Sequence, residues 1–135
     1  MRTQRIKLAA LVGFLLMAAA PVVAHHSFAA EFDANAPLKL QGKVTRIAWT
    51  NPHVWVYLNV MGQDGRAVNW GAEFGAPHQL QNAGWSRDMV KPGDEIIVEG
   101  FRARNQSARM NGRRVTEAAS GRILTGLGAG APPTN

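Results

Sequence analysis

Cysteine is absent from all 135 residues of the chain. Its absence excludes disulfide bonds, thiolate metal ligands, thiol redox chemistry and lipid attachment through an N-terminal Cys. Any domain that the chain forms must therefore be held together by its apolar core.

The sequence also lacks the residue patterns of most enzyme active sites. It has no glycine-rich phosphate loop and no paired-histidine helix motif, and its serines lie in no nucleophile elbow (Ser27, Ser86, Ser107, Ser120). We therefore expect a protein that binds rather than catalyses. A copper oxidase or oxygenase that uses a terminal histidine is the one catalytic alternative with residues to support it.

Basic charge is only in mild excess. The 15 Lys and Arg and 9 Asp and Glu give a net charge of +6, but three of the basic residues lie within positions 1–24. Twelve basic against nine acidic residues then leave +3 for the rest of the chain. This balance does not favour a nucleic-acid partner, and the remaining length fits one compact domain.

The N-terminus carries the pattern of a secretory signal peptide. Residues 1–24 contain an uncharged apolar run that starts at Leu8, ends in Val22-Val23-Ala24 and follows three basic residues (Arg2, Arg5, Lys7). We expect a bacterial Sec-type signal that is cleaved after Ala24, which places the product in the periplasm or outside the cell. The alternative is an uncleaved membrane anchor, for which this run is at the short limit of length.

Beyond the leader, apolar residues recur at every second position, which is typical of strands with one buried face. A first strand from Leu38 to Trp49 changes parity at Thr45-Arg46, which predicts a β-bulge and a bent strand. A second strand from Val54 to Val60 and a third from Val68 to Phe74 are joined by a turn at 62–65. These three strands are expected to form a meander.

A short helix and two further strands follow. Pro77 suits a first helical turn, Leu80 and Ala83 can share a buried face, and Gly84 suits the helix end. A turn at 91–94 precedes a strand through 96–100. Asn111-Gly112 is then expected to turn the chain toward a last strand around Val115.

This order of elements predicts a mainly β fold, a small five-stranded OB-like barrel with one short helix between strands three and four. We expect the barrel to cover residues 38–124, after an N-terminal arm at 25–37 and before a disordered tail at 125–135. A small sandwich with an incidental helix is the alternative.

Cleavage after Ala24 would make His25 the N-terminal residue. The free α-amine and the imidazoles of His25 and His26 would then form a nitrogen-rich chelating group, which suits Cu(II) best and Zn(II) or Ni(II) less selectively. The amine must lose a proton to bind, so affinity should weaken in acid. The alternative is a solvated arm with incidental metal affinity.

His53 is the candidate third metal ligand. It shares its parity with Trp55 and Tyr57, so the three side chains should project from the outer face of the second strand. The alternative is that His53, which follows Asn51-Pro52, fixes the turn by bonding backbone groups.

An aromatic face and an arginine-rich edge offer a second kind of site. Phe28 and Phe32 lie four residues apart and are expected to pack the arm onto Trp55 and Tyr57; otherwise this face is a stacking platform for a ligand. Five arginines lie near the connection between the last two strands (Arg102, Arg104, Arg109, Arg113, Arg114). They could attract an anionic ligand or an envelope protein. The alternative is a solvated edge whose charges discourage aggregation.

Four segments resemble those of a family of small exported bacterial proteins known only as a domain of unknown function. They are His-His-Ser-Phe-Ala-Ala-Glu-Phe-Asp (25–33), Trp-Thr-Asn-Pro-His-Val-Trp (49–55), Ala-Gly-Trp (83–85) and Lys-Pro-Gly-Asp-Glu-Ile-Ile-Val-Glu-Gly (91–100). The resemblance covers nearly all of residues 25–124 and implies an exported, single, β-rich domain, with no reaction or ligand to carry over. His25, His26 and His53 belong to the pattern, whereas His78 departs from it.

Overall fold

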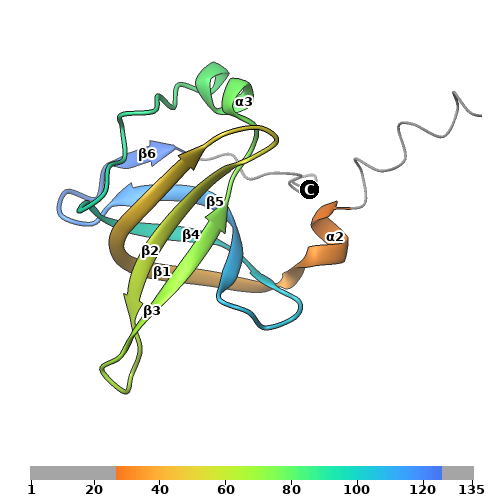
Figure 1. Cartoon of the computed structure of the whole chain (residues 1–135), viewed down its shortest axis with the longest axis vertical. Coiled ribbons are helices and arrows are strands. Elements are labelled where there is room, and N and C mark those ends of the chain that lie inside the picture. The colour runs from red at the N-terminus through yellow and green to blue at the C-terminus, as the bar shows by residue number, and fades with distance from the viewer. Residues whose placement is uncertain (1–26, 126–135) are drawn as a thin grey trace, which may run out of the picture.

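The computed structural model describes residues 27–125, so the predicted leader, His25, His26 and residues 126–135 lie outside the described range. Within it the chain is mainly β, with six strands and two short helices (Figure 1). In chain order these are α2 (Ser27–Glu31), β1 (Phe32–Trp49), β2 (Val54–Met61), β3 (Ala67–Glu73), α3 (Pro77–Asn82), β4 (Glu95–Ala103), β5 (Arg109–Glu117) and β6 (Ile123–Thr125). Strand β1 therefore begins within the segment that we expected to be an arm.

The strands form one sheet that closes on itself. Its order is β3-β2-β1-β4-β5-β6, and β3 also pairs with β5, in parallel. Five strands thus form a ring in which each has two neighbours, and the short β6 extends the sheet from β5. Sequence periodicity indicated the five strands of the ring; β6 and α2 are additional elements.

Strand β1 pairs with two neighbours because it is long and bent. Its first part, Phe32–Lys43, pairs with β4, and its second part, Lys43–Trp49, pairs with β2. The register with β2 shifts between Val44 and Arg46, which confirms the predicted bulge. The shift moves Ile47 onto the inner face, where it is opposite the fully buried Val56.

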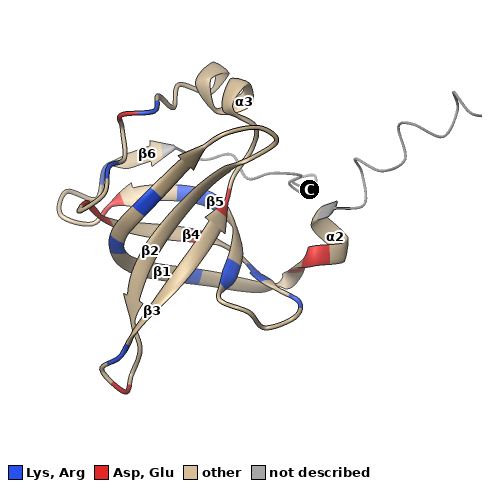
Figure 2. Cartoon of the chain, in the orientation of Figure 1, with Lys and Arg blue, Asp and Glu red and all other residues tan. Residues whose placement is uncertain are grey.

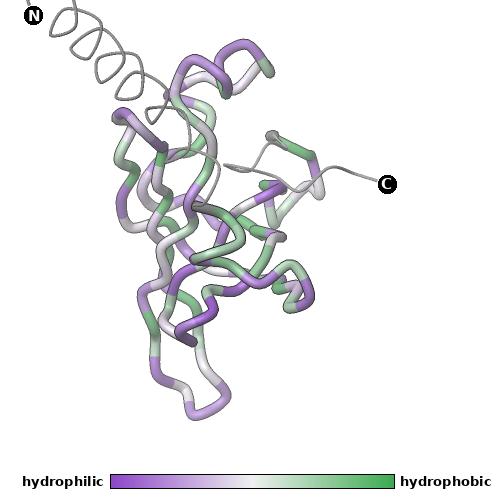
Figure 3. The backbone as a smooth tube through the Cα atoms, turned by 90° about the vertical axis from the view of Figure 1, so that its right-hand side faces the viewer, coloured by the Kyte–Doolittle hydropathy of each residue, from purple (hydrophilic) through white to green (hydrophobic). Residues whose placement is uncertain are grey.

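The inward rows of β2 and β3 form the centre of the core. Val54, Val56 and Leu58 of β2 are all 0 % exposed, and so is Phe74, which follows β3. Hydrophobic and hydrophilic residues alternate along the strands, as expected for a sheet with one buried face (Figure 3). The Phe74 ring meets the Trp85 ring edge to face, with their centroids 5.0 Å apart.

Helix α3 lies beside one end of the ring (Figure 1). Pro77 occupies its first turn, Leu80 is fully buried, and Gly84 has a φ of +88°, which a glycine adopts without strain. These features agree with the sequence prediction. Ala83 is exposed rather than buried, because the chain turns there to bring Trp85 into the core.

The predicted turn at Asn111-Gly112 is wrong. Both residues are buried within β5, and the chain turns earlier, where the amide of Ser107 donates to the side chain of Asn105. Gly112 is required for close packing rather than for a turn, because a Cβ atom there would overlap the ring of Phe74.

Candidate functional site

The predicted site residues fall into three groups. His25 and His26 lie outside the described residues, immediately before α2. His53, Trp55 and Tyr57 lie together at the start and on the outer face of β2, as their parity predicted. The predicted arginine edge occupies the end of β4 and the start of β5, although basic residues are also spread over other strands and loops (Figure 2).

His53 is held by a carboxylate from the neighbouring strand. Glu73 ends β3 and is paired in register with Trp55, which places its side chain on the same outer face. Its Oε1 lies 2.5 Å from Nδ1 of His53, and the two side chains are 10 % and 31 % exposed. His53 therefore bonds a side chain, rather than the backbone groups of the preceding turn.

Burial raises the pKa of Glu73 above its ordinary value of 4.5. The adjacent His53 opposes this shift through its charge and its hydrogen bond, the negative charge of Glu31 adds to it, and Arg109 opposes it. The electrostatic influence of Glu31 means that helix α2 lies near the His53–Glu73 pair.

Arg109 joins this pair to the N-terminal helix. Its Nη2 lies 3.3 Å from Oε2 of Glu31 and 4.0 Å from Oε2 of Glu73. Its guanidinium also lies over the ring of Trp55, 4.9 Å from the ring centroid. One partly exposed side chain at the start of β5 thus contacts α2, β3 and β2.

The aromatic face of β2 is covered by arginines. The rings of Trp55 and Tyr57 stack with centroids 6.2 Å apart, and Arg46 lies 3.9 Å from the Tyr57 ring centroid. The order along the sheet is therefore Arg109, Trp55, Tyr57 and Arg46. We call these four residues the cation–aromatic ladder; its rings stack on each other and on guanidinium groups.

The N-terminal helix packs elsewhere than predicted. The ring contacts of Phe28 are with Phe32, at 5.9 Å, and with Phe101 of β4, at 5.8 Å. The prediction that Phe28 packs against Trp55 and Tyr57 is therefore wrong. Phe32 is instead only 3 % exposed and is paired in register with Ala103, which draws the helix toward β4.

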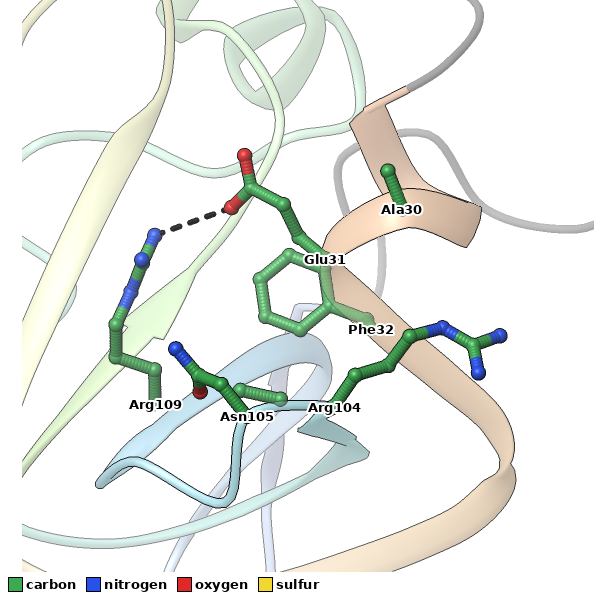
Figure 4. A pocket seen from close by; sticks show the side chains of 7 residues that line it. Ala30, Glu31, Phe32, Arg104, Asn105 and Arg109 are labelled. Atoms are coloured by element: carbon green, nitrogen blue, oxygen red, sulfur yellow. Dashed lines mark hydrogen bonds and ion pairs between the residues drawn. The ribbon is translucent and has the colours of Figure 1, made fainter.

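Two arginines of the predicted edge hold the helix in place. Arg104 donates from Nε to the carbonyl oxygen of Ala29 at 2.7 Å, and Arg109 binds Glu31. A pocket of about 270 Å³ lies between them, beside Asn105 (Figure 4). Arg102 stacks over Trp70 at 5.4 Å. These predicted partner-binding arginines thus have partners within the chain.

The site found in the structure overlaps a family match. A family model matches residues 12–112 of the sequence. The chain belongs to DUF6152, a family of unknown function. The residues matched in this DUF6152 protein include His25, His26, His53, Glu73 and Arg109. No curated protein matches the chain.

Metal-ligating side chains are not clustered in the described part of this DUF6152 protein. Residues 27–125 contain no group of three or more His, Cys, Asp or Glu side chains that could hold a metal ion. No helix in the same range is long and apolar enough to cross a bilayer.

Sequence reasoning recognised His53 but could not pair it. From the sequence, Glu31, Asp33 and Glu73 could all approach the histidines, and spacing alone does not select one of them. The available signal for Glu73 was its parity within the third strand, opposite to that of the inward Ala72 and Phe74.

Proposed function

We propose that this protein is an exported, non-catalytic binding protein that captures Cu(II). The ligands are His25 and His26 at its processed N-terminus, and His53 completes the ligand set. The observation that carries the proposal is the 2.5 Å contact between Nδ1 of His53 and the buried carboxylate of Glu73. A histidine oriented in this way is a common part of metal sites, where a carboxylate fixes the ring from behind.

The contact determines which nitrogen can bind a metal. Nδ1–H donates to Glu73, so the lone pair of His53 is on Nε2, at the other side of the ring. The carboxylate also makes the imidazole a stronger donor. Since His53 is 31 % exposed, Nε2 can meet a ligand set that arrives from another part of the chain.

The anchoring of α2 supports a meeting of the two donor groups. Helix α2 begins at Ser27, directly after His26, and its last residue, Glu31, binds Arg109. Arg109 in turn contacts Glu73. One or two residues span about 7 Å when extended, so the anchoring of α2 keeps His25 and His26 within that reach of the first residue of the helix.

Copper suits this donor set best. Two or three imidazoles with an α-amine match the tetragonal nitrogen preference of Cu(II), while Zn(II) and Ni(II) would bind less selectively. Because the chelating amine exists only after cleavage at Ala24, the proposal includes export by a Sec-type signal to the periplasm or beyond the cell.

We also propose that the ring of strands is an OB-like barrel. In support, β1 is long and bent, five strands each have two neighbours, and α3 follows β3 in the chain. The rigid ring would present His53 while the N-terminal segment supplies the remaining ligands.

A Cu(II) titration tests the proposal. Protein that begins at His25 is compared with a version carrying one extra N-terminal residue and with His53→Ala, while His78→Ala is the matched control, since His78 is exposed and lies on α3. We expect the extension and His53→Ala each to weaken Cu(II) binding roughly tenfold or more, as for a lost ligand or its support. The proposal fails if both bind as tightly as the control.

The cation–aromatic ladder supports a second function. Arg109 is 44 % exposed at one end of the ladder, so the outer face of β2 can attract an anionic ligand or an envelope protein partner. In that case Trp55→Ala or Arg109→Ala removes partner binding, and neither the N-terminal extension nor His25→Ala changes it.

A further inference from the structure

We propose that a second site, independent of the copper proposal, binds a small amphipathic anion, namely a carboxylate with an aromatic or short aliphatic body. The site is an open pocket of about 380 Å³ between the bulged part of β1 and the segment 87–92 that leads into β4. This volume lies within the range of small-ligand pockets.

The two walls of the pocket are fixed to each other by backbone hydrogen bonds. The amide of Gly93 donates to the carbonyl oxygen of Val44 at 2.8 Å, and the amide of Val44 donates to that of Asp94 at 2.8 Å. The bulge follows directly after Val44. The pocket is therefore formed before any ligand arrives, which reduces the entropy lost on binding.

The floor of the pocket is apolar. Ile47 and Trp49 of β1 line it, together with Val90 and Pro92 from the opposite wall. Val90 is 1 % exposed, and the Trp49 ring packs edge to face on the buried Trp85 at 5.7 Å. The floor is thus an extension of the hydrophobic core that reaches the surface and can accept an apolar ligand body.

The rim of the pocket is cationic. Arg46, Arg87 and Lys91 are its charged lining residues, and no acidic residue lines it. Within residues 27–125 none of the three forms an ion pair with a carboxylate. Arg46 also stacks on the ring of Tyr57, and Arg87 donates to the carbonyl oxygen of Trp49 at 3.5 Å. These contacts orient the two guanidinium groups but do not neutralise them, so the net positive charge of the rim favours an anion.

Two acidic residues close to the rim in sequence, Asp88 and Asp94, accept hydrogen bonds from uncharged groups. Asp88 accepts a hydrogen bond from the hydroxyl of Ser86 at 2.6 Å, and Asp94 accepts one from the backbone amide of Lys91 at 2.8 Å. Neither carboxylate forms an ion pair with a rim cation, although the pKa of Asp88 is lowered by the hydrogen bond from Ser86 and, to a smaller extent, by the charge of Lys91. The positive rim is therefore available to a ligand.

The combination of floor and rim selects the ligand class. An inorganic anion would gain the charge contacts but leave the apolar floor exposed to water, and a neutral apolar compound would leave the cations unused. A carboxylate with an aromatic body satisfies both, because its charged end faces the rim and its ring covers Ile47 and Trp49.

Binding of 2-naphthoate tests this site, followed by NMR of the Trp49 indole N–H and by calorimetry. The double variant combines Arg87→Gln with Lys91→Gln, and each substitution removes one exposed charge. Arg66→Gln is the matched control, because Arg66 is also exposed and without an ion pair among the described residues but lies in the β2–β3 hairpin. The neutral comparison is 2-naphthalenemethanol, and the inorganic comparison is sulfate.

We expect 2-naphthoate to shift the Trp49 resonance, and the double variant to raise its Kd roughly tenfold, as for the loss of two charge contacts near the surface. Arg66→Gln should leave Kd unchanged, while the alcohol and sulfate bind at least several-fold more weakly than the carboxylate. The proposal is overturned if 2-naphthoate does not bind, if Trp49 does not respond, if the alcohol or sulfate binds equally well, or if the control variant loses as much affinity as the pocket variants.

Discussion

Replacing Arg109 by Ala tests whether one side chain fastens the N-terminal helix to the sheet. In the structure Arg109 binds Glu31 of α2 at 3.3 Å, lies 4.0 Å from Glu73 of β3 and covers the ring of Trp55 at 4.9 Å. The substitution removes all three contacts at once. If Arg109 holds α2 on the sheet, the substitution should lower the free energy of unfolding and also speed hydrogen exchange in α2.

The size of the effect follows from the exposure of each contact. The pair with Glu31 is half exposed on both sides and contributes at most about 0.5 kcal/mol. The stacking on Trp55 contributes about 0.5–1 kcal/mol. Loss of the cation near the buried Glu73 costs about 1 kcal/mol. We therefore expect the free energy of unfolding to fall by about 2 kcal/mol, which corresponds to a Tm lower by about 10 °C in a domain of this size.

Urea unfolding followed by far-UV circular dichroism measures this change without relying on Trp55 fluorescence. Arg114→Ala is the control, because Arg114 is 57 % exposed and its one ion pair within residues 27–125 is with Glu99, at 3.6 Å. We expect Arg114→Ala to lower the free energy of unfolding by less than about 0.5 kcal/mol. Hydrogen exchange at residues 29–31 should accelerate only in the Arg109 variant. Equal destabilisation by the two substitutions, or unchanged exchange in α2, would refute the reasoning.

Two further substitutions probe the buried carboxylate of Glu73 and the close packing of Gly112 against Phe74. Burial holds the pKa of Glu73 above 4.5, so the protonated side chain contributes stability that is fully present below pH 4.5 and is lost as the pH rises through the raised pKa. We therefore expect Glu73→Gln to gain stability relative to the natural protein as the pH rises above 4.5. A constant difference in urea midpoints across this pH range would contradict the prediction. Gly112→Ala should lower the free energy of unfolding by about 1–3 kcal/mol, since its Cβ would overlap the Phe74 ring. Phe74→Leu in the same chain should recover part of that loss, and strictly additive effects would count against the overlap as its cause.

The local features of this fold can be predicted from the periodicity of the sequence. Alternation of apolar residues identified the strands of the ring, and the change of parity near Thr45-Arg46 identified the bulge that the register confirms. Parity also placed His53, Trp55 and Tyr57 on one outer face. These properties depend on neighbours one to four residues apart, so a single sequence carries them.

The structural role of Gly112 could not be predicted from its neighbours in the sequence. Asn111-Gly112 has the composition of a hairpin turn, yet the pair lies inside β5 and is buried. What decides its role is the ring of Phe74, which occupies the space that a side chain at 112 would need. Composition alone cannot distinguish a glycine that turns the chain from one that admits a distant neighbour.

The sequence by itself determined the strands, the bulge and the outer face that displays His53, while the tertiary structure decided which charges and rings meet there. Arg109 and Glu31 are separated by 78 positions, and Phe28 meets Phe101 rather than the aromatic residues of β2. Such contacts depend on how β1 bends and on which strands become neighbours when β3 meets β5. Side-chain period is a property of each strand alone, whereas the partners of a side chain are set by the closure of the whole sheet.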